Sequence, residues 1–515
     1  MRASLASSIA VTCAAVLALP VSLAAPAAAE VPPALGLPPA LSAQPPKPDL
    51  PGATQSLPLE ALGGDADRSL GGGADGTDAQ GLTRRDVRPF SLVGVVWDDP
   101  AAALHGTVQV RTRATGGDVW SEWQDVETHN EEHGADPDTA EGSGRALKGS
   151  TAPLWVGDSD GVEIRVRGEE PLPEGLRLEL VDPGEGPGAP APGSVPAPAP
   201  VTRTAASPIP VAGLAGLTGL HAAEAAASAV NAQLAAFGAH WIPALSKEAT
   251  EITIPFLPRT QTMESLWSHL PYVQTASAED AEDAAAQAAE DAAAQDAAQP
   301  DAPEAAQPAA AKPYIGPRPK IITRKGWGAD EKIREKGFVY TKSIKAAFVH
   351  HSATGNNYTC GQAPSVLRSI YRYHVLSSGW RDFGYNFAVD KCGNIYEGRA
   401  GGVAKPVLGA HTLGFNTNSM GIAVLGTFSK TTPPAAAVTA VARLTAWKLG
   451  LYGLNPQGTS YLVSGGGNLY KKGTKVRFNA IAGHRDGFAT ECPGVRLYGK
   501  LGTARASSAK YQGRR

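Results

Sequence analysis

Aromatic residues are scarce in this sequence, whereas glycine and proline are abundant. Phe, Trp and Tyr make up 6% of the 515 residues, while 58 glycines and 42 prolines account for nearly a fifth of them. A chain of this composition contains long stretches that cannot bury enough apolar surface to fold. The length alone would allow about three domains of roughly 150 residues each. The composition instead favours two compact domains joined by disordered connectors.

The sequence also lacks an excess of charge of one sign. Its 46 Lys and Arg residues oppose 49 Asp and Glu residues, which leaves a formal net charge of −3. A domain that holds nucleic acid usually carries a positive field or a basic face. We therefore expect no nucleic-acid partner.

Long hydrophobic runs are missing after the N-terminus. Arg2 precedes a mostly apolar stretch that is broken by Pro20, and the alanines at positions 27–29 offer a small-residue cleavage site. This arrangement is typical of a signal peptide, predicted here over residues 1–29, and an uncleaved membrane anchor is the alternative. No later window holds 18 consecutive apolar residues, so we expect an exported mature protein without a transmembrane anchor.

Cysteine is rare as well, with four residues in the whole chain. Cys13 lies in the predicted signal peptide, so three cysteines remain in an oxidising compartment. An odd number means that at least one thiol has a role other than a disulfide within the chain.

The N-terminal half contains one folded segment between two that lack periodicity. Residues 30–86 are rich in Pro, Gly and Ala and are predicted to be a disordered leader. Over residues 87–182, apolar side chains recur at every second position between Gly, Asp and Pro turns, as at Val108 and Val110. This period is typical of half-buried strands, so we predict an antiparallel β-sandwich as a separate accessory domain.

Three further segments connect this domain to the C-terminal part. Residues 183–210 are a Pro/Ala/Gly linker, and residues 211–276 form a connector that is partly helical by its Ala and Leu content. Residues 277–313 are Ala-rich and acidic, with no Lys or Arg between Arg259 and Lys312. We expect this last segment to be a solvated tether.

The last domain is predicted over residues 314–507, where strand and helix patterns alternate. Apolar runs predict strands, and a 3.6-residue period predicts helices. The predicted strands cover 346–351, 385–389, 395–397 and 420–425, and the predicted helices cover 364–377 and 435–451. This mixture predicts an α/β domain with a mixed central sheet flanked by helices.

Three residues in this domain have the chemistry of metal ligands. His350 ends a predicted strand, and His484 and Cys492 lie eight residues apart in a later loop. A catalytic zinc needs three protein ligands of this kind and an open position for water. Spacing alone leaves open that these are ordinary surface or core residues.

Four motifs resemble those of a known family. In order, they are FVHHSAT, YRYHVLSSGWRDFGYNFAVDKCGNIYEGRAGG, GAHTLGFNTNSMGIAVLGTF and GHRDGFATECPG. From about residue 321 to 498, a third of the chain, the sequence is similar to the peptidoglycan recognition protein and type 2 amidase family in its secreted actinobacterial form. The resemblance implies a zinc-dependent N-acetylmuramoyl-L-alanine amidase, which cuts the amide between N-acetylmuramic acid and L-alanine of peptidoglycan.

The resemblance also assigns roles at the site. It implies that His350, His484 and Cys492 bind Zn²⁺, and that Tyr385 hydrogen-bonds the developing tetrahedral centre, unless Tyr385 is only a packed aromatic residue. Thr490 matches the threonine variant of a catalytic position. The general base stays open, because a threonine hydroxyl orients water but does not hold a proton at neutral pH.

Four other residues match positions that line the substrate groove of the family, and for each a structural role is the alternative. They are His374, Trp380, Arg399 and His411. Residues 400–402 depart from the pattern of animal members, so we make no prediction about stem-peptide preference. In the accessory domain, Trp120 and Trp123 are either hydrophobic plugs or a carbohydrate site.

The same assignment leaves Cys360 and Cys392 as the remaining pair of cysteines. With Cys492 bound to zinc, export makes a disulfide between these two the expected state, and two unpaired buried thiols are the alternative. Closing a loop of this length contributes about 3–4 kcal/mol on the chain-entropy account.

We therefore expect a secreted, monomeric amidase, extracellular or associated with the cell wall, whose partner is peptidoglycan. The competing hypothesis is a non-catalytic peptidoglycan-binding protein of the same fold. The cysteine ligand discriminates between the two, because members of the family that only bind peptidoglycan typically lack it.

Overall fold

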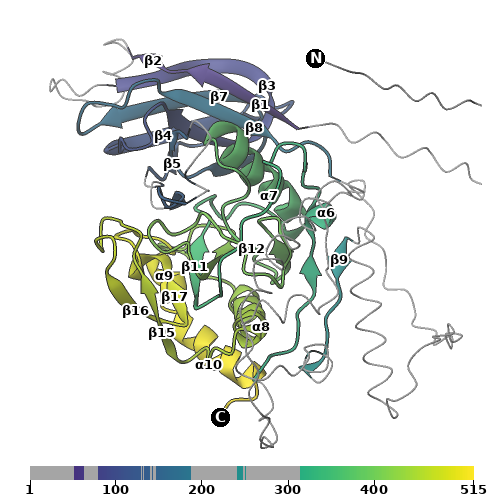
Figure 1. The fold of residues 1–515 in the computed structure, drawn as a ribbon. Helices are drawn as coiled ribbons and strands as arrows, with labels where there is room; N and C mark the ends of the chain where they lie inside the picture. The colour runs from purple at the N-terminus through teal and green to yellow at the C-terminus, as the bar shows by residue number, and fades with distance from the viewer. Residues whose placement is uncertain are drawn as a thin grey trace, which may run out of the picture. The chain divides into compact units, whose positions relative to one another are not determined.

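The computed structural model (Figure 1) describes residues 52–62, 79–128, 130, 133–139, 142, 147–186, 240–247, 250 and 314–515. The chain divides into two compact units, Met1–Pro48 and Asp49–Arg515. The first unit lies outside the described residues, as do the predicted signal peptide, the acidic tether and most of the segments 183–210 and 211–276. Within the described part, no helix is both long and apolar enough to cross a lipid bilayer.

The N-terminal domain is an antiparallel β structure of eight strands, as its period-2 pattern predicts. The strands are β1 (Ala53–Pro58), β2 (Glu60–Ala61), β3 (Ala79–Trp97), β4 (Gly106–Ala114), β5 (Gln124–Val126), β6 (Gly149–Ser150), β7 (Leu154–Gly168) and β8 (Arg177–Asp182). Hydrogen bonds join them in the order β1-β8-β3-β7-β4-β5, and both β2 and β6 pair with β3. The register between β3 and β7 shifts at three places, which is where such long strands bend. Alternate residues of β4, β7 and β8 fill one hydrophobic core.

The predicted leader at 30–86 is wrong over part of its length, because β1, β2 and the first residues of β3 lie within it. β1 is an edge strand that pairs only with β8, and its one buried residue is the polar Gln55. The Gln55 side chain bonds the backbone of Arg88 through both its amide nitrogen and its oxygen. Main-chain pairing therefore holds this strand in place, and the sequence carries no apolar alternation that would reveal it.

The C-terminal domain contains the predicted mixed sheet. Its seven strands follow the order β17-β11-β14-β12-β13-β10-β9. They are β9 (Trp241–Ile242), β10 (Ile321–Ile322), β11 (Ala346–His351), β12 (Phe387–Val389), β13 (Ile395–Glu397), β14 (Ser419–Val424) and β17 (Ile481–Gly483), and a separate hairpin contains β15 (Thr459–Val463) and β16 (Lys475–Asn479). The central pairs β17–β11, β11–β14 and β14–β12 are parallel, whereas β12–β13 and β10–β9 are antiparallel.

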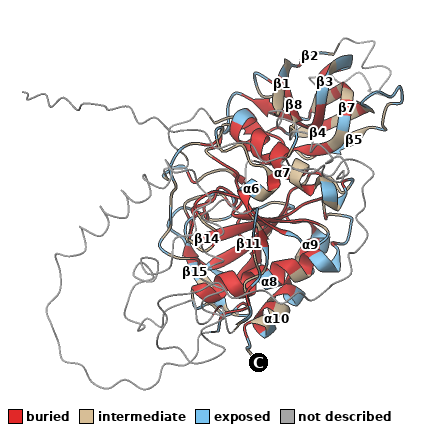
Figure 2. Ribbon diagram, turned by 90° about the vertical axis from the view of Figure 1, so that its right-hand side faces the viewer, coloured by how far each residue is buried: buried red, intermediate tan, exposed pale blue. Residues whose placement is uncertain are grey.

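Helices cover both faces of this sheet. They are α6 (Arg324–Trp327), α7 (Ala363–Arg372), α8 (Ala435–Leu451), α9 (Val495–Tyr498) and α10 (Leu501–Tyr511), so the domain extends beyond the predicted end at 507. Ile422 and Val424 of β14 pack in one hydrophobic cluster with α8 and α10. Ala423 lies in a second cluster with α7. Figure 2 shows the resulting burial of α8 and of strands β11 and β14.

The 211–276 connector contributes to this domain in a way that its composition did not predict. Its strand β9 adds to the edge of the sheet by pairing with β10. The Leu245 backbone N–H also donates to the Arg318 carbonyl. A two-residue strand held by main-chain bonds leaves no periodic signal in the sequence.

The two domains have separate sheets, but α7 packs against both of them. Leu92, Val96 and Trp155 of the N-terminal domain belong to the same hydrophobic cluster as α7. A π-helical turn, Tyr373–Ser377, continues α7, and its Tyr373 hydroxyl lies 3.0 Å from the Thr151 carbonyl. The helix is therefore buried between the domains along most of its length.

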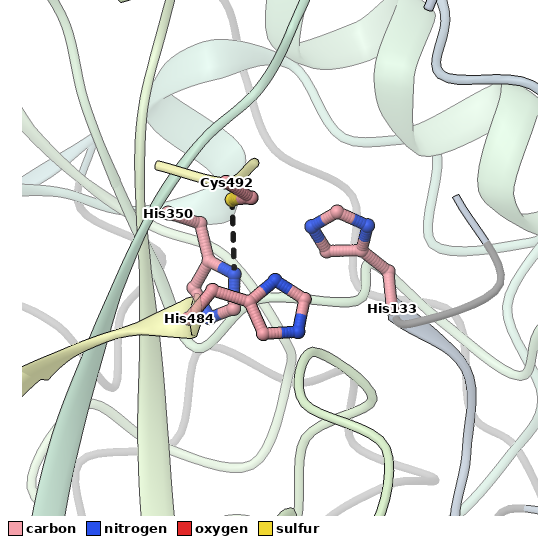
Figure 3. A group of neighbouring side chains, drawn as sticks. All are labelled: His133, His350, His484 and Cys492. Carbon is pink, nitrogen blue, oxygen red and sulfur yellow. Dashed lines mark hydrogen bonds between the residues drawn. The ribbon is translucent and has the colours of Figure 1, made fainter. Parts of the chain in front are cut away.

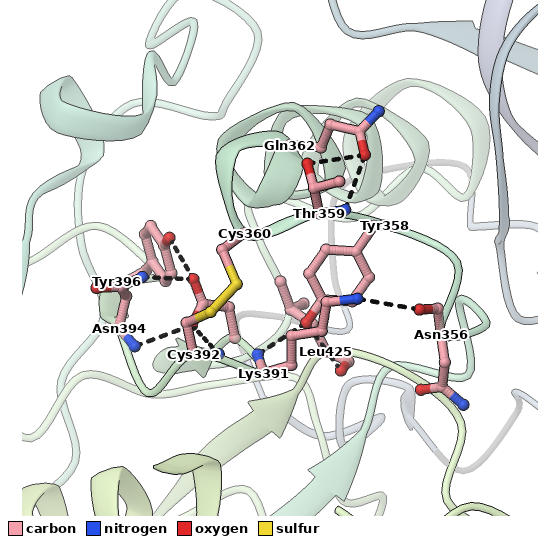
Figure 4. Close-up of a disulfide and its surroundings, with 11 residues drawn as sticks. Asn356, Tyr358, Thr359, Cys360, Gln362, Lys391, Cys392, Asn394, Tyr396 and Leu425 are labelled. Carbon is pink, nitrogen blue, oxygen red and sulfur yellow. Dashed lines mark hydrogen bonds between the residues drawn. A yellow bond between two sulfur atoms is a disulfide. The ribbon is translucent and has the colours of Figure 1, made fainter. Parts of the chain in front are cut away.

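A disulfide joins Cys360 to Cys392, as the sequence predicts (Figure 4). The two Cα atoms lie 6.1 Å apart, within the usual range for a bridge. Cys360 opens the turn before α7, and Cys392 lies at the tip of the β12–β13 hairpin. The Asp390 carboxylate accepts hydrogen bonds from the Cys392 and Asn394 backbone, so the bridge fastens α7 to an already ordered turn.

Replacing both bridge cysteines, Cys360→Ala together with Cys392→Ala, should lower the free energy of unfolding by about 3–4 kcal/mol, because the unfolded chain regains the freedom of a closed loop. Urea unfolding of the variant and the wild type measures this difference. Peptide mapping without reduction should recover the two cysteines in one linked peptide. Equal unfolding free energies, or a linked peptide that contains Cys492, would contradict the assignment.

Candidate metal centre

The strand register places two of the predicted ligands side by side. β11 and β17 are parallel neighbours in which Val349 lies opposite Gly483. His350 follows Val349 and His484 follows Gly483. The two histidines therefore lie at the same level at the ends of neighbouring strands. Parallel strands present their carboxyl ends at one edge of the sheet, which is where sites in such sheets form.

Cys492 reaches the same point from a loop. The Cys492 carbonyl accepts a hydrogen bond of 3.0 Å from the Arg485 backbone N–H, which holds the loop against the turn His484–Asp486. The Cys492 N–H donates to the Thr490 hydroxyl at 3.1 Å. Thr490, the predicted catalytic threonine, thus has an observed role in orienting the cysteine.

The three predicted ligands form a compact cluster, and a fourth residue joins it (Figure 3). The ligand atoms of His133, His350, His484 and Cys492 all lie within 4.8 Å of one another. The Cys492 Sγ is 3.8 Å from the His350 Nδ1. All four residues are buried, so their geometry is set by packing rather than by solvent.

The electrostatics of the cluster fit a metal ion. Burial holds the pKa of His350 well below its ordinary value, and the neighbouring His484 and His411 lower it further. Its imidazole is therefore neutral at physiological pH, which is the form that donates a lone pair to a metal. Imidazole nitrogen and thiolate sulfur are together typical ligands of Zn²⁺. The residues present thus suit zinc.

Tyr385 lies next to the cluster. The centre of its ring is 5.2 Å from that of the His350 imidazole, and it is 4% exposed. It precedes β12, whose pairing with β14 places Phe387 opposite Ile422. The ring thus lies beside the cluster and also packs on Phe383 and His374, and its catalytic role stays a prediction.

The four predicted substrate residues are all buried and all have specific internal partners, among them the Thr412 hydroxyl at 3.0 Å from the His411 Nδ1. The His374 Nδ1 accepts from the Gly384 N–H at 3.2 Å, and its ring stacks on Trp380 at 4.3 Å. Arg399 donates through Nε to the Phe383 carbonyl at 2.8 Å. Their role in substrate contact stays a prediction.

The two remaining histidines near the centre differ in position. His411 is buried, and its ring lies 5.3 Å from that of His350. His351 points to the other side of β11, where its Nδ1 accepts from the Phe428 N–H at 3.4 Å. His351 is therefore not part of the cluster.

The tryptophans of the accessory domain are stacked with arginines. The Arg165 guanidinium lies 4.1 Å and that of Arg111 4.8 Å from the centre of the Trp123 ring. Arg84 lies 5.1 Å from the centre of the Trp120 ring. Because arginines already occupy these ring faces, the arrangement favours the structural alternative over a carbohydrate site.

Sequence reasoning missed His133. It belongs to the N-terminal domain and precedes His350 by more than 200 positions. No spacing motif joins a residue of one domain to ligands in another, so only the packing of the two domains could reveal it.

Comparisons with known proteins assign both domains to families. Residues 340–495 match the family model described as N-acetylmuramoyl-L-alanine amidase. Residues 40–202 match one described as Rv3811 N-terminal galactose-binding domain-like. The solved structure of wild-type Drosophila PGRP-LB is 27% identical and covers 36% of this chain and 92% of that chain, with a TM-score of 0.28, which is too low to support an argument.

Relatives match about a third of the chain. Peptidoglycan-recognition protein SC2 of Drosophila melanogaster is 30% identical over 185 residues, which are 36% of this chain and 85% of that protein. The N-acetylmuramoyl-L-alanine amidase of Homo sapiens is 30% identical over 192 residues, which are 36% of this chain and 28% of that protein. This similarity covers 85% of the Drosophila protein. The chain therefore belongs to the family of peptidoglycan-recognition proteins and N-acetylmuramoyl-L-alanine amidases.

Proposed function

We propose that this protein is a secreted zinc-dependent N-acetylmuramoyl-L-alanine amidase that hydrolyses the amide between N-acetylmuramic acid and L-alanine of peptidoglycan. The observation that carries the proposal is the convergence of His350, His484 and Cys492, which come from three separate segments, beside Tyr385. A protein that only binds peptidoglycan has no need for a buried thiol among histidines.

The residues of the site have distinct roles in this proposal. His350, His484 and Cys492 hold the zinc, which when bound polarises a carbonyl oxygen and makes water a stronger nucleophile at neutral pH. The Tyr385 hydroxyl donates a hydrogen bond to the oxygen on which negative charge develops. Thr490 fixes the cysteine loop through its bond to the Cys492 N–H. The general base remains unassigned, since a threonine cannot fill that role.

Cys492→Ser should abolish zinc binding at stoichiometric level and with it the release of free stem peptide, because a serine hydroxyl is not a thiolate ligand. Metal analysis of the purified protein and mass analysis of digested peptidoglycan measure the two effects. His484→Ala should likewise lose zinc binding and the release of free stem peptide. His240→Ala, at an exposed position, serves as the matched control and should retain both properties. Full zinc and full hydrolysis in Cys492→Ser would refute the ligand set.

Tyr385→Phe should leave the zinc content unchanged and lower kcat by about 10²–10³-fold, the usual effect of losing one hydrogen bond to a developing oxyanion. Steady-state kinetics on a soluble muramyl peptide measure it. As the control, Tyr461→Phe removes a hydroxyl from a tyrosine ring that is 51% exposed. It should change neither kcat nor the zinc content. An unaltered kcat in Tyr385→Phe would mean that the ring is only a packing residue.

A further inference from the structure

His133 occupies the position from which a fourth ligand would approach the metal. Its ring centre lies 4.7 Å from that of His484, 5.4 Å from that of His350 and 5.8 Å from that of Tyr385. Figure 3 shows its imidazole facing the other three ligands from a different part of the chain. Tetrahedral zinc with bonds of about 2.0–2.3 Å separates its ligand atoms by roughly 3.3–3.6 Å. The four atoms, within 4.8 Å of one another, need only a small contraction to match.

Residues 133–139, here called the docking segment, are held on the C-terminal domain by specific bonds. The Asp136 carboxylate accepts from the Gly414 N–H at 2.6 Å and from the Asn416 side chain at 3.0 Å. The Gly134 carbonyl accepts a further bond of 3.1 Å from Asn416. Asp138 forms an ion pair with Lys472. Asp136 is 5% exposed, so its bonds are shielded from solvent.

The contacts between the N-terminal domain and the C-terminal domain also enclose the region that a substrate would need to enter. Tyr385 and His374 are 4% and 3% exposed. The small cavity beside them is lined from the N-terminal domain by Glu127, Asn130 and His133. A glycan strand with its stem peptide cannot reach residues buried to this degree unless the docking segment and the other cavity-lining residues of the N-terminal domain move.

We propose that His133 is a fourth zinc ligand and that the described arrangement is a latent form of the amidase. The inference rests on the proposed function, because it requires the zinc held by His350, His484 and Cys492. Catalytic zinc sites keep one position open, whereas sites with four protein ligands are structural and closed. Peptidoglycan hydrolysis then requires His133 to leave, which couples activity to release of the docking segment.

The test uses the full chain loaded with Co²⁺, whose visible absorption reports the number and kind of its ligands. His133→Ala should retain the metal but change the spectrum, and added imidazole should restore the wild-type spectrum by filling the vacated position. His105→Ala replaces an exposed histidine of the same domain and should leave the spectrum as it is in the wild type.

Kinetics on a soluble muramyl peptide with the zinc form provide the second readout. In the open form, His133 has left the metal. If this form makes up about a tenth of the wild-type population or less, the kcat of His133→Ala should be at least about tenfold higher than that of the wild type. Added imidazole should reverse this increase. Asp136→Ala keeps His133 but removes its anchor, so it should also be faster with unchanged zinc content. This second variant preserves the test if His133→Ala fails to fold.

The outcomes separate this inference from the proposed function. The fourth-ligand assignment would be overturned if the wild type and His133→Ala both bound metal and had identical cobalt spectra. It would also be overturned if His133→Ala were slower while its spectrum stayed unchanged. Either result would leave the proposed amidase function intact. Wild-type protein and His133→Ala that both bind no metal would overturn the proposed function, and this inference with it.

Discussion

The site depends on the parallel register of β11 with its neighbours. β14 and β17 flank β11, and all six residues of β11 are buried, so a shift by one residue would exchange the two faces of the strand. His350 would then exchange places with His351, and its alignment with His484 would be lost. The pairing of Val349 with Gly483 thus fixes the metal-ligand cluster through main-chain pairing rather than through contacts between the ligand side chains.

The second constraint is the helix that the two domains share. On α7, Arg368 donates through Nε to the Pro183 carbonyl at 3.1 Å, and Arg372 donates through Nη2 to the Gly52 carbonyl at 2.6 Å. A buried guanidinium is stabilised by each donor that finds a backbone acceptor, as these two donors do. Ser377, at the end of the helix, donates to the Glu179 carboxylate at 2.8 Å. The polar side of α7 is therefore an interface rather than a solvated face.

This interface joins the accessory domain to the C-terminal domain, which contains His350, His484 and Cys492. The proposed amidase activity on a polymer needs an open groove, yet the predicted groove residues are buried. Partners within the C-terminal domain bury these residues, and the N-terminal domain packs around them through its contacts with α7 and through residues 133–139. In the proposed amidase, the accessory domain would therefore control access to the cluster of His350, His484 and Cys492.

The sequence alone determined much of the local structure and pointed to the proposed chemistry. Alternating valines predicted the strands of the N-terminal domain, the 3.6-residue period over residues 364–377 predicted α7, and the motifs predicted His350, His484, Cys492 and the disulfide. These features are encoded within a few neighbouring residues or by family resemblance. The tertiary structure alone decided that β1 and β9 are strands, because edge strands are held by main-chain bonds that leave no side-chain pattern. It also decided the place of His133, because a contact between domains depends on how two folded surfaces fit and not on any spacing along the chain.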